Sequence, residues 1–291
     1  MTDPGERALL RPGDTVQLTD QKGRHHTLVL EAGRTFHTHR GGIDHDEMIG
    51  QPEGIVVSSA RGTSYVVLRS LLEDFVLAMP RGAAVIYPKD AARITMACGL
   101  RPGSTVLEAG AGSGALTCSL LTAVGDAGQV VSCERRPDFA EVARSNVTQW
   151  FGTPPPAWTL VVGDLRDWPV EEGFDAMVLD MLDPWEYLDI ASRAVRPGGV
   201  FVGYVATTTQ LSRLAEDLRA TGEWTEPRAE ESLVRTWHLE GLAVRPDHRM
   251  IGHTGFLLIS RRLAPGTVLP PRRRRPAKGA QDTGTVDDTE S

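Results

Sequence analysis

Three acidic residues stand at the ends of three strand-like runs in the middle of the chain. Glu108 lies in VLEAG, Glu134 ends QVVSCE and Asp164 ends WTLVVGD. Because parallel strands present their carboxyl ends at one edge of a sheet, these carboxylates are expected to face a common ligand. Glu108 would hold an ammonium group, Glu134 would accept hydrogen bonds from both hydroxyls of a ribose, and Asp164 would receive the amino group of an adenine.

A glycine-rich turn accompanies the first acid. Gly110, Gly112 and Gly114 follow a strand and open a helix, which permits a tight turn and the close approach of a ligand to the backbone. The stretch also fits the G-x-G-x-x-A pattern of dinucleotide enzymes, and each acid taken alone could be an ordinary helix cap. Glu108, however, would repel a pyrophosphate. A ligand with an ammonium group, a ribose and an adenine but no phosphate is S-adenosylmethionine, which we predict as the cofactor.

A fourth strand-like run, FDAMVLD, ends at Asp180 and continues into MLDPW. In an open parallel sheet, ligands bind outside the carboxyl ends of the strands, where the strand order reverses. A methyl donor lying over the first three strands would direct its methyl group toward this fourth end. Asp180 is therefore the predicted catalytic residue, and Asp183 is expected on the loop or rim. The predicted cofactor-binding residues are Glu108, Gly110, Gly112, Ser113, Gly114, Ala115, Glu134, Asp164, Leu165 and Asp180.

The order of the segments predicts the fold that positions these residues. Strand-like and helix-like segments alternate from residue 91 onward, which is typical of β-α-β units in an α/β fold with a mostly parallel, doubly wound sheet. Two further strand-like runs, LVRTWHLEGLAV and TGFLLISRR, are expected to close this region. Short alternating runs before residue 72 predict a small N-terminal β domain. The expected boundaries are 1–72 for the β domain, 73–90 for a connector, 91–263 for the α/β domain and 264–291 for a disordered tail.

Five motifs together carry a resemblance to a known family. They are IYPKD (86–90), VLEAGAGSGALT (106–117), LDMLDPWE (179–186), VGYVATTTQL (202–211) and GHTGFLL (252–258). With the acidic strand ends, the chain up to about residue 263 resembles bacterial tRNA (adenine-58-N1)-methyltransferases. The resemblance implies a class I, Rossmann-like methyltransferase domain, methylation of N1 of the adenine at position 58 in the T-loop of tRNA, and a homotetramer.

The chemistry of that reaction suits the predicted pocket. Adenine N1 carries an in-plane lone pair, so attack on a sulfonium methyl needs alignment and charge stabilisation more than a base. Asp180 would accept a hydrogen bond from the exocyclic amine of the base, which must be extruded from its stack to expose N1. Tyr87, Tyr204 and Gln210 are the predicted substrate-binding residues. The alternative for these three is two core tyrosines and a helix-cap glutamine.

Composition narrows the class of partner. The formal net charge of -7 argues against generic coating of DNA, although it leaves room for a local basic patch. RNA contacts are expected from the β domain and from arginines such as Arg245, Arg249, Arg261 and Arg262. Cys98, Cys118 and Cys133 show no metal-binding spacing, so no metal is expected. No apolar run approaches the length that spans a bilayer and no leader is recognisable, which predicts a cytoplasmic protein without membrane contact.

Two rival functions remain open at this point. A methyltransferase with the same cofactor half could act on protein carboxyl groups or on a small molecule, because fold alone does not fix the substrate. A non-catalytic RNA-binding scaffold would be expected to have a damaged acceptor pocket. The appended β domain and the LDMLDPW stretch favour a polynucleotide substrate, and the presence of Asp180 and Tyr204 favours catalysis.

Overall fold

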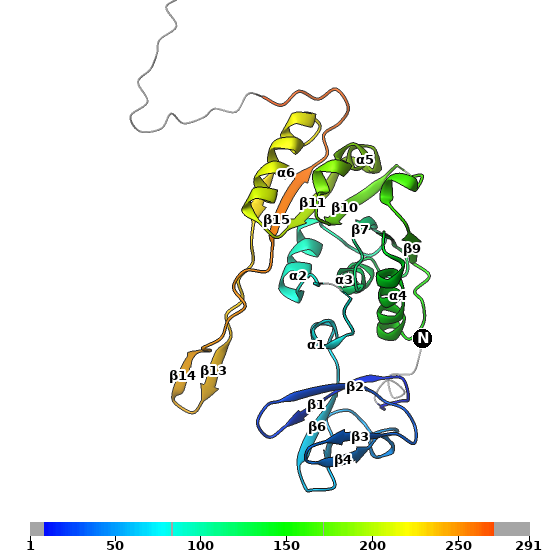
Figure 1. Ribbon diagram of the computed structural model, residues 1–291, viewed down its shortest axis with the longest axis vertical. Coiled ribbons are helices and arrows are strands. Elements are labelled where there is room, and N and C mark those ends of the chain that lie inside the picture. Colours follow the sequence, from blue (N-terminus) through cyan, green and yellow to red (C-terminus); the bar gives the residue numbers. More distant parts are fainter. Residues whose placement is uncertain (1–8, 83, 171, 271–291) are drawn as a thin grey trace, which may run out of the picture.

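The computed structural model describes residues 9–82, 84–170 and 172–270. A small N-terminal β domain lies at one end, an α/β body forms the other, and a two-stranded arm projects from the body beside the β domain (Figure 1). Most of the predicted disordered tail, 264–291, lies outside the described residues.

The N-terminal domain is antiparallel, and its sheet has the order β2-β1-β6-β5. In β1 (Thr15–Asp20) Val16 and Leu18 are fully buried while their neighbours are partly exposed, as the alternation of TVQLTD predicts. These two side chains pack with Tyr65 and Val67 in a core of their own. The remaining elements of this domain are β2 (His25–Val29), β3 (Thr35–Thr38), β4 (Gly41–Asp44), the 3-10 helix η2 (His45–Glu47), β5 (Val56–Ser58) and β6 (Ser64–Arg69).

The segment predicted as a connector contains a short helix, α1 (Leu72–Ala78), and an extended stretch that leads into α2 (Pro88–Ala97). Pro88 at the first turn of α2 suits a position where no backbone donor is needed. The extended stretch is tied to the glycine-rich turn, because the Gly82 amide donates to Ser113 Oγ at 3.1 Å. The connector is therefore attached to the glycine-rich turn.

The body is built on a seven-stranded sheet of order β12-β15-β11-β10-β7-β8-β9. Five of these strands are parallel and β15 is antiparallel, which confirms the predicted α/β fold with a mostly parallel sheet. The chain order reverses between β7 and β10, so the switch point at which ligands bind lies there. The strands are β7 (Thr105–Ala109), β8 (Gln129–Glu134), β9 (Trp158–Val162), β10 (Phe174–Asp180), β11 (Val195–Val205), β12 (Arg228–Glu230) and β15 (Phe256–Arg261).

Helices cover both faces of this sheet. One hydrophobic cluster joins α1, α2 and α3 (Ala115–Val124) to side chains such as Val106 and Val178. A second cluster packs α5 (Leu188–Ala194) and α6 (Thr208–Thr221) against Leu107 and Leu179. Neighbouring residues of β7 and β10 thus point to opposite faces. Helix α4 (Pro137–Phe151) and the 3-10 helices η3 (Leu165–Asp167) and η4 (Pro184–Tyr187) complete the body.

One expected strand is instead a separate hairpin. The run LVRTWHLEGLAV contains β13 (Trp237–Glu240) and the start of β14 (Ala243–Pro246). Among the described strands these two pair only with each other, whereas the following run forms β15 as predicted. The tight turn at Gly241, with φ +53, reverses the chain before it can reach the large sheet. One predicted strand limit also differs, since β9 ends at Val162, two residues before Asp164.

Gly110 makes the tightest backbone contact at the switch point. A Cβ built on Gly110 would lie 1.9 Å from the carbonyl oxygen of Asp180, and its φ is +88. We expect Gly110→Ala to destabilise the protein more than Gly99→Ala, by about 1–3 kcal/mol, because overpacking adds to the strain of a positive φ. Gly99 (φ +62) is a matched control, because an added Cβ there meets nothing within 4 Å. Urea unfolding compares the two, and equal losses of stability would contradict the contact.

Candidate functional site

Three of the predicted acids lie on one face of the sheet. In the parallel register, Glu108 on β7 is opposite Ser132 on β8 and Val178 on β10, so the three share a face. Glu134 and Asp180 are two residues further along their strands and therefore point the same way. The carboxyl ends of β7, β8 and β10 thus bring three carboxylates together beside the glycine-rich turn.

Glu108 is buried and only half satisfied. Its Oε2 accepts hydrogen bonds from Thr117 Oγ1 at 2.7 Å and Ser132 Oγ at 2.5 Å, whereas its buried Oε1 has no partner in the part of the chain that the structure describes. Ser132 Oγ also receives the Trp158 indole at 3.0 Å. Burial raises the pKa of Glu108 to about 7, although the two hydroxyl hydrogen bonds oppose the shift. A buried acceptor oxygen without a donor suits the ammonium group predicted for this place.

Glu134 closes the glycine-rich turn. Its Oε2 accepts the amide of Gly112 at 2.9 Å and its Oε1 accepts the amide of Arg136 at the same distance. Each carboxylate oxygen retains a second lone pair, so hydrogen bonds from two ribose hydroxyls can be added without breaking these. A Cβ on Gly112 would meet nothing nearer than 3.9 Å, so the open side of the turn is at this glycine.

The other turn residues mainly contact protein. A Cβ on Gly114 would lie 3.1 Å from Val147 of α4, and Ala115 is buried at the start of α3. The Ser113 hydroxyl accepts a hydrogen bond from the Gly82 amide. The Ser113 carbonyl accepts one from Asn146 Nδ2 at 2.9 Å. Packing against protein therefore requires glycine at Gly110 and Gly114, whereas Gly112 faces open space. Binding of the cofactor by these residues remains a prediction.

Asp164 lies two residues beyond the end of β9 and caps η3. It accepts the Arg166 amide at 3.0 Å and the Tyr187 hydroxyl on both oxygens, at 3.1 and 3.0 Å. The backbone hydrogen bond from Arg166, supported by Tyr187, lowers the pKa of Asp164. Leu165 is buried in the core beneath. The contact of Tyr187 with Asp164 was not predicted. The position of Tyr187 directly after LDMLDPWE was the only signal in the sequence that could have indicated it.

Asp180 is the acid with the fewest constraints. Burial and the negative charges of Glu108 and Glu134 raise its pKa to about 7. Within the described ranges 9–82, 84–170 and 172–270, no group hydrogen-bonds its carboxylate, which remains partly exposed at the end of β10. Its acceptor oxygens are therefore available to a bound molecule. Asp183, on the same loop, is exposed and precedes η4, as expected for a rim residue.

Gln210 is held by its own helix. It closes a capping box at the start of α6, in which Thr207 N donates to Gln210 Oε1 at 3.1 Å and Gln210 N donates to Thr207 Oγ1 at 3.2 Å. Its Nε2 donates to the carbonyl of Leu182 at 2.9 Å. These contacts favour the helix-cap alternative, in which Gln210 positions the loop after Asp180; its contact with substrate remains a prediction.

Tyr204 belongs to a buried polar network that the motifs IYPKD and GHTGF build jointly. It is opposite Asp180 in the β10–β11 register, and its hydroxyl lies 3.5 Å from Oδ2 of the fully buried Asp90. Lys89 Nζ pairs with Asp90 at 2.8 Å and donates to Thr254 Oγ1 at 2.6 Å. Burial raises the pKa of Tyr204. The network was not predicted, although Lys89, Asp90 and Thr254 stand inside quoted motifs.

Tyr87 is partly buried at the residue before α2, two positions from that network. The Tyr204 ring packs closely against the backbone of Gly255, because a Cβ built on Gly255 would lie 2.4 Å from Tyr204 Cζ. The Tyr204 ring is thus fixed in position next to Asp180. Both tyrosines therefore remain candidates to flank a bound base, with Tyr204 held rigidly.

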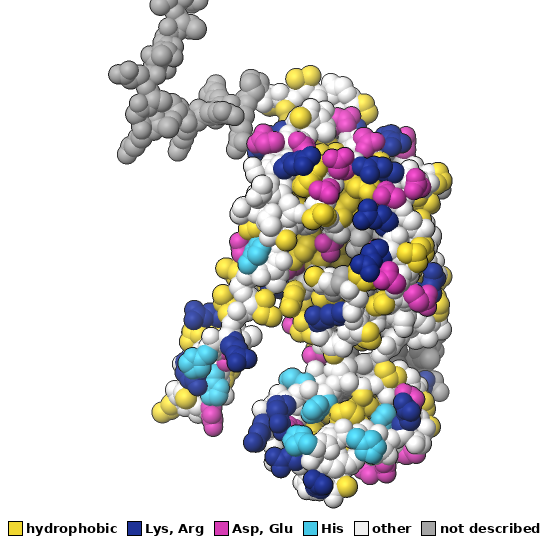
Figure 2. All heavy atoms as spheres, in the orientation of Figure 1, with side chains coloured by type: hydrophobic (Ala, Val, Ile, Leu, Met, Phe, Trp, Pro, Cys, Tyr) yellow, Lys and Arg dark blue, Asp and Glu magenta, His cyan; other side chains and the backbone are white. Residues whose placement is uncertain are grey.

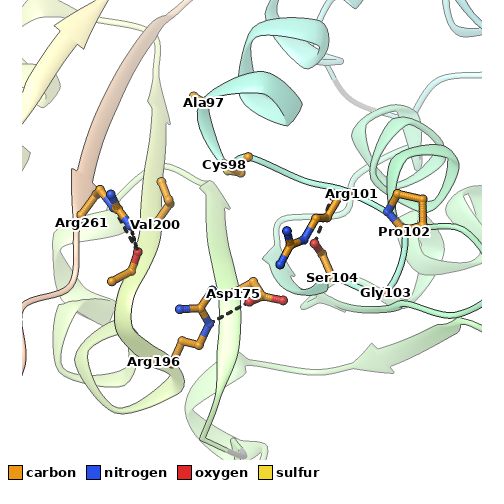
Figure 3. A pocket seen from close by; sticks show the side chains of 12 residues that line it. Ala97, Cys98, Arg101, Pro102, Gly103, Ser104, Asp175, Arg196, Val200 and Arg261 are labelled. Carbon is orange, nitrogen blue, oxygen red and sulfur yellow. Dashed lines mark hydrogen bonds and ion pairs between the residues drawn. The ribbon is translucent and has the colours of Figure 1, made fainter.

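A cavity of about 630 Å³ lies at the opposite edge of the sheet (Figure 3). It is lined by Asp175 and Arg196 near the beginnings of β10 and β11, by Arg261 at the end of the antiparallel β15 and by Arg101. Arg196 pairs with Asp175 at 2.7 Å, and Arg261 donates to the Gly198 carbonyl. Since ligands of such sheets bind at the carboxyl ends of the strands, this cavity is separate from the acidic site.

Two of the arginines expected to contact RNA have structural partners. Arg262 is only 10% exposed and donates to the Ser192 and Glu223 carbonyls, so its assignment to RNA was wrong. Arg261 lies at the far cavity, whereas Arg245 and Arg249 are exposed on or next to the arm. The described residues contain no cluster of His, Cys, Asp or Glu arranged to hold a metal ion, and no described helix is long and apolar enough to cross a membrane.

The raised pKa of Asp180 predicts a pH-dependent stability. The pKa of Asp180 is about 7 in the folded protein, compared with the ordinary 3.8, so the unfolded chain loses this proton at lower pH. The free energy of unfolding should therefore fall as pH rises from about 4 to 7. In cofactor-free protein, Asp180→Asn should raise the free energy of unfolding at pH 8 and change it little at pH 4. Urea unfolding at both values checks this, with the rim variant Asp183→Asn as control. A pH-independent effect would contradict the assignment.

Comparisons with known proteins match this chain over nearly its whole described length. Residues 9–57 match the family model TrmI-like N-terminal, and residues 64–244 match the model of the tRNA methyltransferase complex GCD14 subunit. The tRNA (adenine(58)-N(1))-methyltransferase TrmI of Thermus thermophilus is 35% identical over 84% of this chain and 95% of its own length. A Methanocaldococcus jannaschii TrmI, named for adenines 57 and 58, is 30% identical over 84% of this chain and 93% of its own length.

Solved structures agree with the sequence matches. An S-adenosylmethionine-dependent O-methyltransferase from Thermotoga maritima superposes with a TM-score of 0.84 and 31% identity, over 93% of this chain and 98% of that one. A tRNA methyltransferase TrmI from Aquifex aeolicus gives a TM-score of 0.78 and 27% identity, over 88% of this chain and 99% of that one. With a family model that covers more than half of its residues and relatives matched over nearly their whole length, the chain belongs to the TrmI and GCD14 family of tRNA methyltransferases.

Proposed function

We propose that this protein transfers the methyl group of S-adenosylmethionine to N1 of the adenine at position 58 in the T-loop of tRNA. The observation that carries the proposal is the Asp180 carboxylate, which has no hydrogen-bond partner among the described residues and lies beside Glu108 and Glu134 at the switch point of the sheet. Family membership supplies the substrate class, and the acids supply the chemistry.

The acidic residues suit each part of the cofactor. The buried, unpartnered Oε1 of Glu108 would accept the ammonium group, and Glu134 would add two ribose hydroxyls to its present amide donors. Asp164, held at the edge by Tyr187, would receive the adenine amino group. The ligand brings positive charge to a cluster in which the carboxylates repel one another, so binding would favour their ionised forms.

The transfer itself needs orientation and charge stabilisation. As the N1 lone pair forms the new N–CH₃ bond, the electrons of the S–CH₃ bond remain on sulfur, and the positive charge passes from the sulfonium to the adenine ring. Ionised Asp180 would accept a hydrogen bond from the exocyclic amine and stabilise that charge. The base would be extruded into the pocket, with Tyr87 and Tyr204 flanking it and Gln210 fixing the loop that carries Leu182.

Two other functions compete with this one for the same site. The Thermotoga maritima neighbour is described as an O-methyltransferase, so methylation of a carboxyl or hydroxyl oxygen is the rival within the same fold. Carboxylate acceptors would be repelled by the three acids, whereas a base that becomes cationic is favoured by them. A non-catalytic scaffold is disfavoured because Asp180 and the Tyr204 network are intact.

Replacement of Asp180 tests the proposal directly. Asp180→Asn should lower the rate of methyl transfer by at least about 100-fold, the order found when one electrostatic group of an active site is removed. Asp183→Asn, three residues away on the exposed rim, should keep most of the activity. Labelled cofactor is incubated with unmodified tRNA, and the digested nucleosides are identified by mass spectrometry. Label in a protein or metabolite but in no RNA would refute the tRNA proposal, and bound but unlabelled tRNA would support the scaffold.

We also propose a homotetramer that acts in the cytoplasm. The arm formed by β13 and β14 projects from the body (Figure 1), and several of its apolar side chains are exposed. Trp237 and Leu239 share one face of the arm with their cross-strand neighbours Pro246 and Val244. Trp237 is 54% exposed and Leu239 is 73% exposed, which is unusual for a surface that stays in water and suits contact with another copy of the chain.

Charges on that face should weaken self-association. Leu239→Glu with Val244→Lys places an opposite-charge pair across the hairpin, so the hairpin is preserved while its apolar face is removed. Sedimentation velocity should show the wild type as a tetramer and this variant as smaller species. The pair His238→Ala with Arg245→Ala, in register on the other face, should leave the tetramer intact. A monomeric wild type, or an unchanged tetramer in the charged variant, would contradict the proposed role of the arm.

A further inference from the structure

Three turns of the N-terminal domain lie together at one edge of its sheet. Antiparallel pairing places the β1–β2 turn next to the β5–β6 turn, because Thr19 pairs with His25, Asp20 with Tyr65 and Ser58 with Ser64. The tip of the β3–β4 hairpin is attached to the same place. There, Ser59 Oγ donates to the Arg40 carbonyl at 2.7 Å, and the Ala60 amide donates to the Gly42 carbonyl at 3.0 Å.

This edge carries an excess of positive charge on a protein whose formal net charge is -7. The turns contain four cations and one carboxylate among residues 20–25, 38–41 and 58–64. The carboxylate, Asp20, is buried and pairs with Arg24 at 2.6 Å, so it does not offset the others. The basic edge, as we name it, consists of Lys22, Arg24, Arg40 and Arg61, with the exposed imidazoles of His25 and His39.

The groups of the basic edge are presented outward on a fixed frame. Arg61 Nη1 donates to the His39 carbonyl at 3.3 Å, and Arg40 Nε lies 3.1 Å from His39 Nε2, which leaves further N–H groups of both guanidinium ions free to bind. A Cβ on Gly41 would lie 3.1 Å from the Arg61 amide, so the hairpin tip is packed against the β5–β6 turn. The three turns therefore form one continuous surface.

The basic edge lies on the side of the molecule where the arm and the connector meet the carboxyl edge of the parallel strands, which holds the candidate site. The arm leaves the body at the carboxyl edge of the parallel strands, since Phe256 of β15 pairs with Val205 at the end of β11. The connector is joined to the glycine-rich turn at that same edge by the Gly82–Ser113 hydrogen bond. In Figure 2, Lys, Arg and His side chains gather on the side of the N-terminal domain that faces the arm, across an open gap.

We propose that the basic edge binds the sugar-phosphate backbone of the tRNA substrate at a distance from the adenine that is methylated. This inference rests on the proposed function and names a second contact surface for the same substrate. Arginine and lysine side chains on turns bind phosphate oxygens and set the position of the nucleic acid without selecting a base. The two imidazoles supply rings that can stack on unpaired bases.

The test removes charge from the basic edge without disturbing the buried Asp20–Arg24 pair. A triple variant, Lys22→Gln, Arg40→Gln and Arg61→Gln, is compared with wild-type protein for tRNA affinity at several salt concentrations. We expect the slope of log affinity against log salt to fall by about 3, roughly one for each phosphate that the variant no longer binds. The KM for tRNA should rise, while kcat at saturating tRNA and the affinity for S-adenosylmethionine stay near the wild-type values.

Two further variants isolate the effect of position. Arg34→Gln, Arg144→Gln and Arg193→Gln remove the same charge from exposed ion pairs elsewhere and should leave the salt slope unchanged. Replacement of Lys22 by Arg and of Arg40 and Arg61 by Lys should restore tRNA affinity.

The outcomes separate this proposal from the proposed function. Wild-type tRNA affinity and salt slope in the triple variant, with methyl transfer intact, would overturn the role of the basic edge, and a changed sedimentation coefficient would then assign the edge to contact between copies. A wild type that binds tRNA without forming N1-methyladenine would overturn the proposed function alone. A wild type that binds no tRNA would overturn both.

Discussion

The close contact between Gly110 and the backbone of Asp180 is the constraint on which the site depends. A Cβ at Gly110 would lie 1.9 Å from the Asp180 carbonyl oxygen, so β7 and β10 can end side by side only if this residue is glycine. That contact lies at the switch point of the sheet, where the Asp180 carboxylate is beside Glu108 of β7 and Glu134 of β8. Three sets of contacts hold the elements around the Asp180 carboxylate. They are the hydrogen bond from the Gly112 amide to Glu134, the capping box of Gln210, and the network of Lys89, Asp90 and Thr254.

The electrostatics of the site follow from this geometry. Three carboxylates share one face, and burial together with their mutual repulsion raises the pKa values of Glu108 and Asp180 to about 7. Ionisation of these carboxyl groups is unfavourable without a cation and becomes favourable when a cation binds beside them. A sulfonium cofactor and a base that becomes cationic during the reaction both supply that charge, which is why the same cluster suits binding and catalysis.

The sequence predicted the features that depend on local pattern. Alternating segments were sufficient to predict the parallel sheet, and the acidic strand ends were sufficient to predict that Glu108, Glu134 and Asp180 lie at one edge of it, because strand ends in such folds share one edge. It did not separate the roles of the glycines, since only the folded backbone shows that Gly110 and Gly114 meet protein while Gly112 faces open space. The Lys89–Asp90–Thr254 network was also missed, because Thr254 is 165 residues from Lys89 and nothing local marks their contact.

The arm and the basic edge show a different limit. The run around Trp237 has the alternation of a sheet strand, and only its pairing reveals a hairpin that leaves the body. The cations of the basic edge are scattered over three turns whose adjacency comes from the register of β1, β5 and β6. Arg262, which the sequence offered as an RNA contact, instead donates its hydrogen bonds to carbonyl groups within the body.

The central claim, that this site methylates N1 of adenine 58, is tested most directly by reverse transcription of tRNA after incubation with protein and S-adenosylmethionine. A methyl group on N1 blocks the pairing edge of the base. The account predicts a stop or misincorporation at position 58 that requires the cofactor and is absent with Asp180→Asn. Full-length, unaltered cDNA from tRNA that has nevertheless incorporated label would place the methyl group elsewhere and contradict the account.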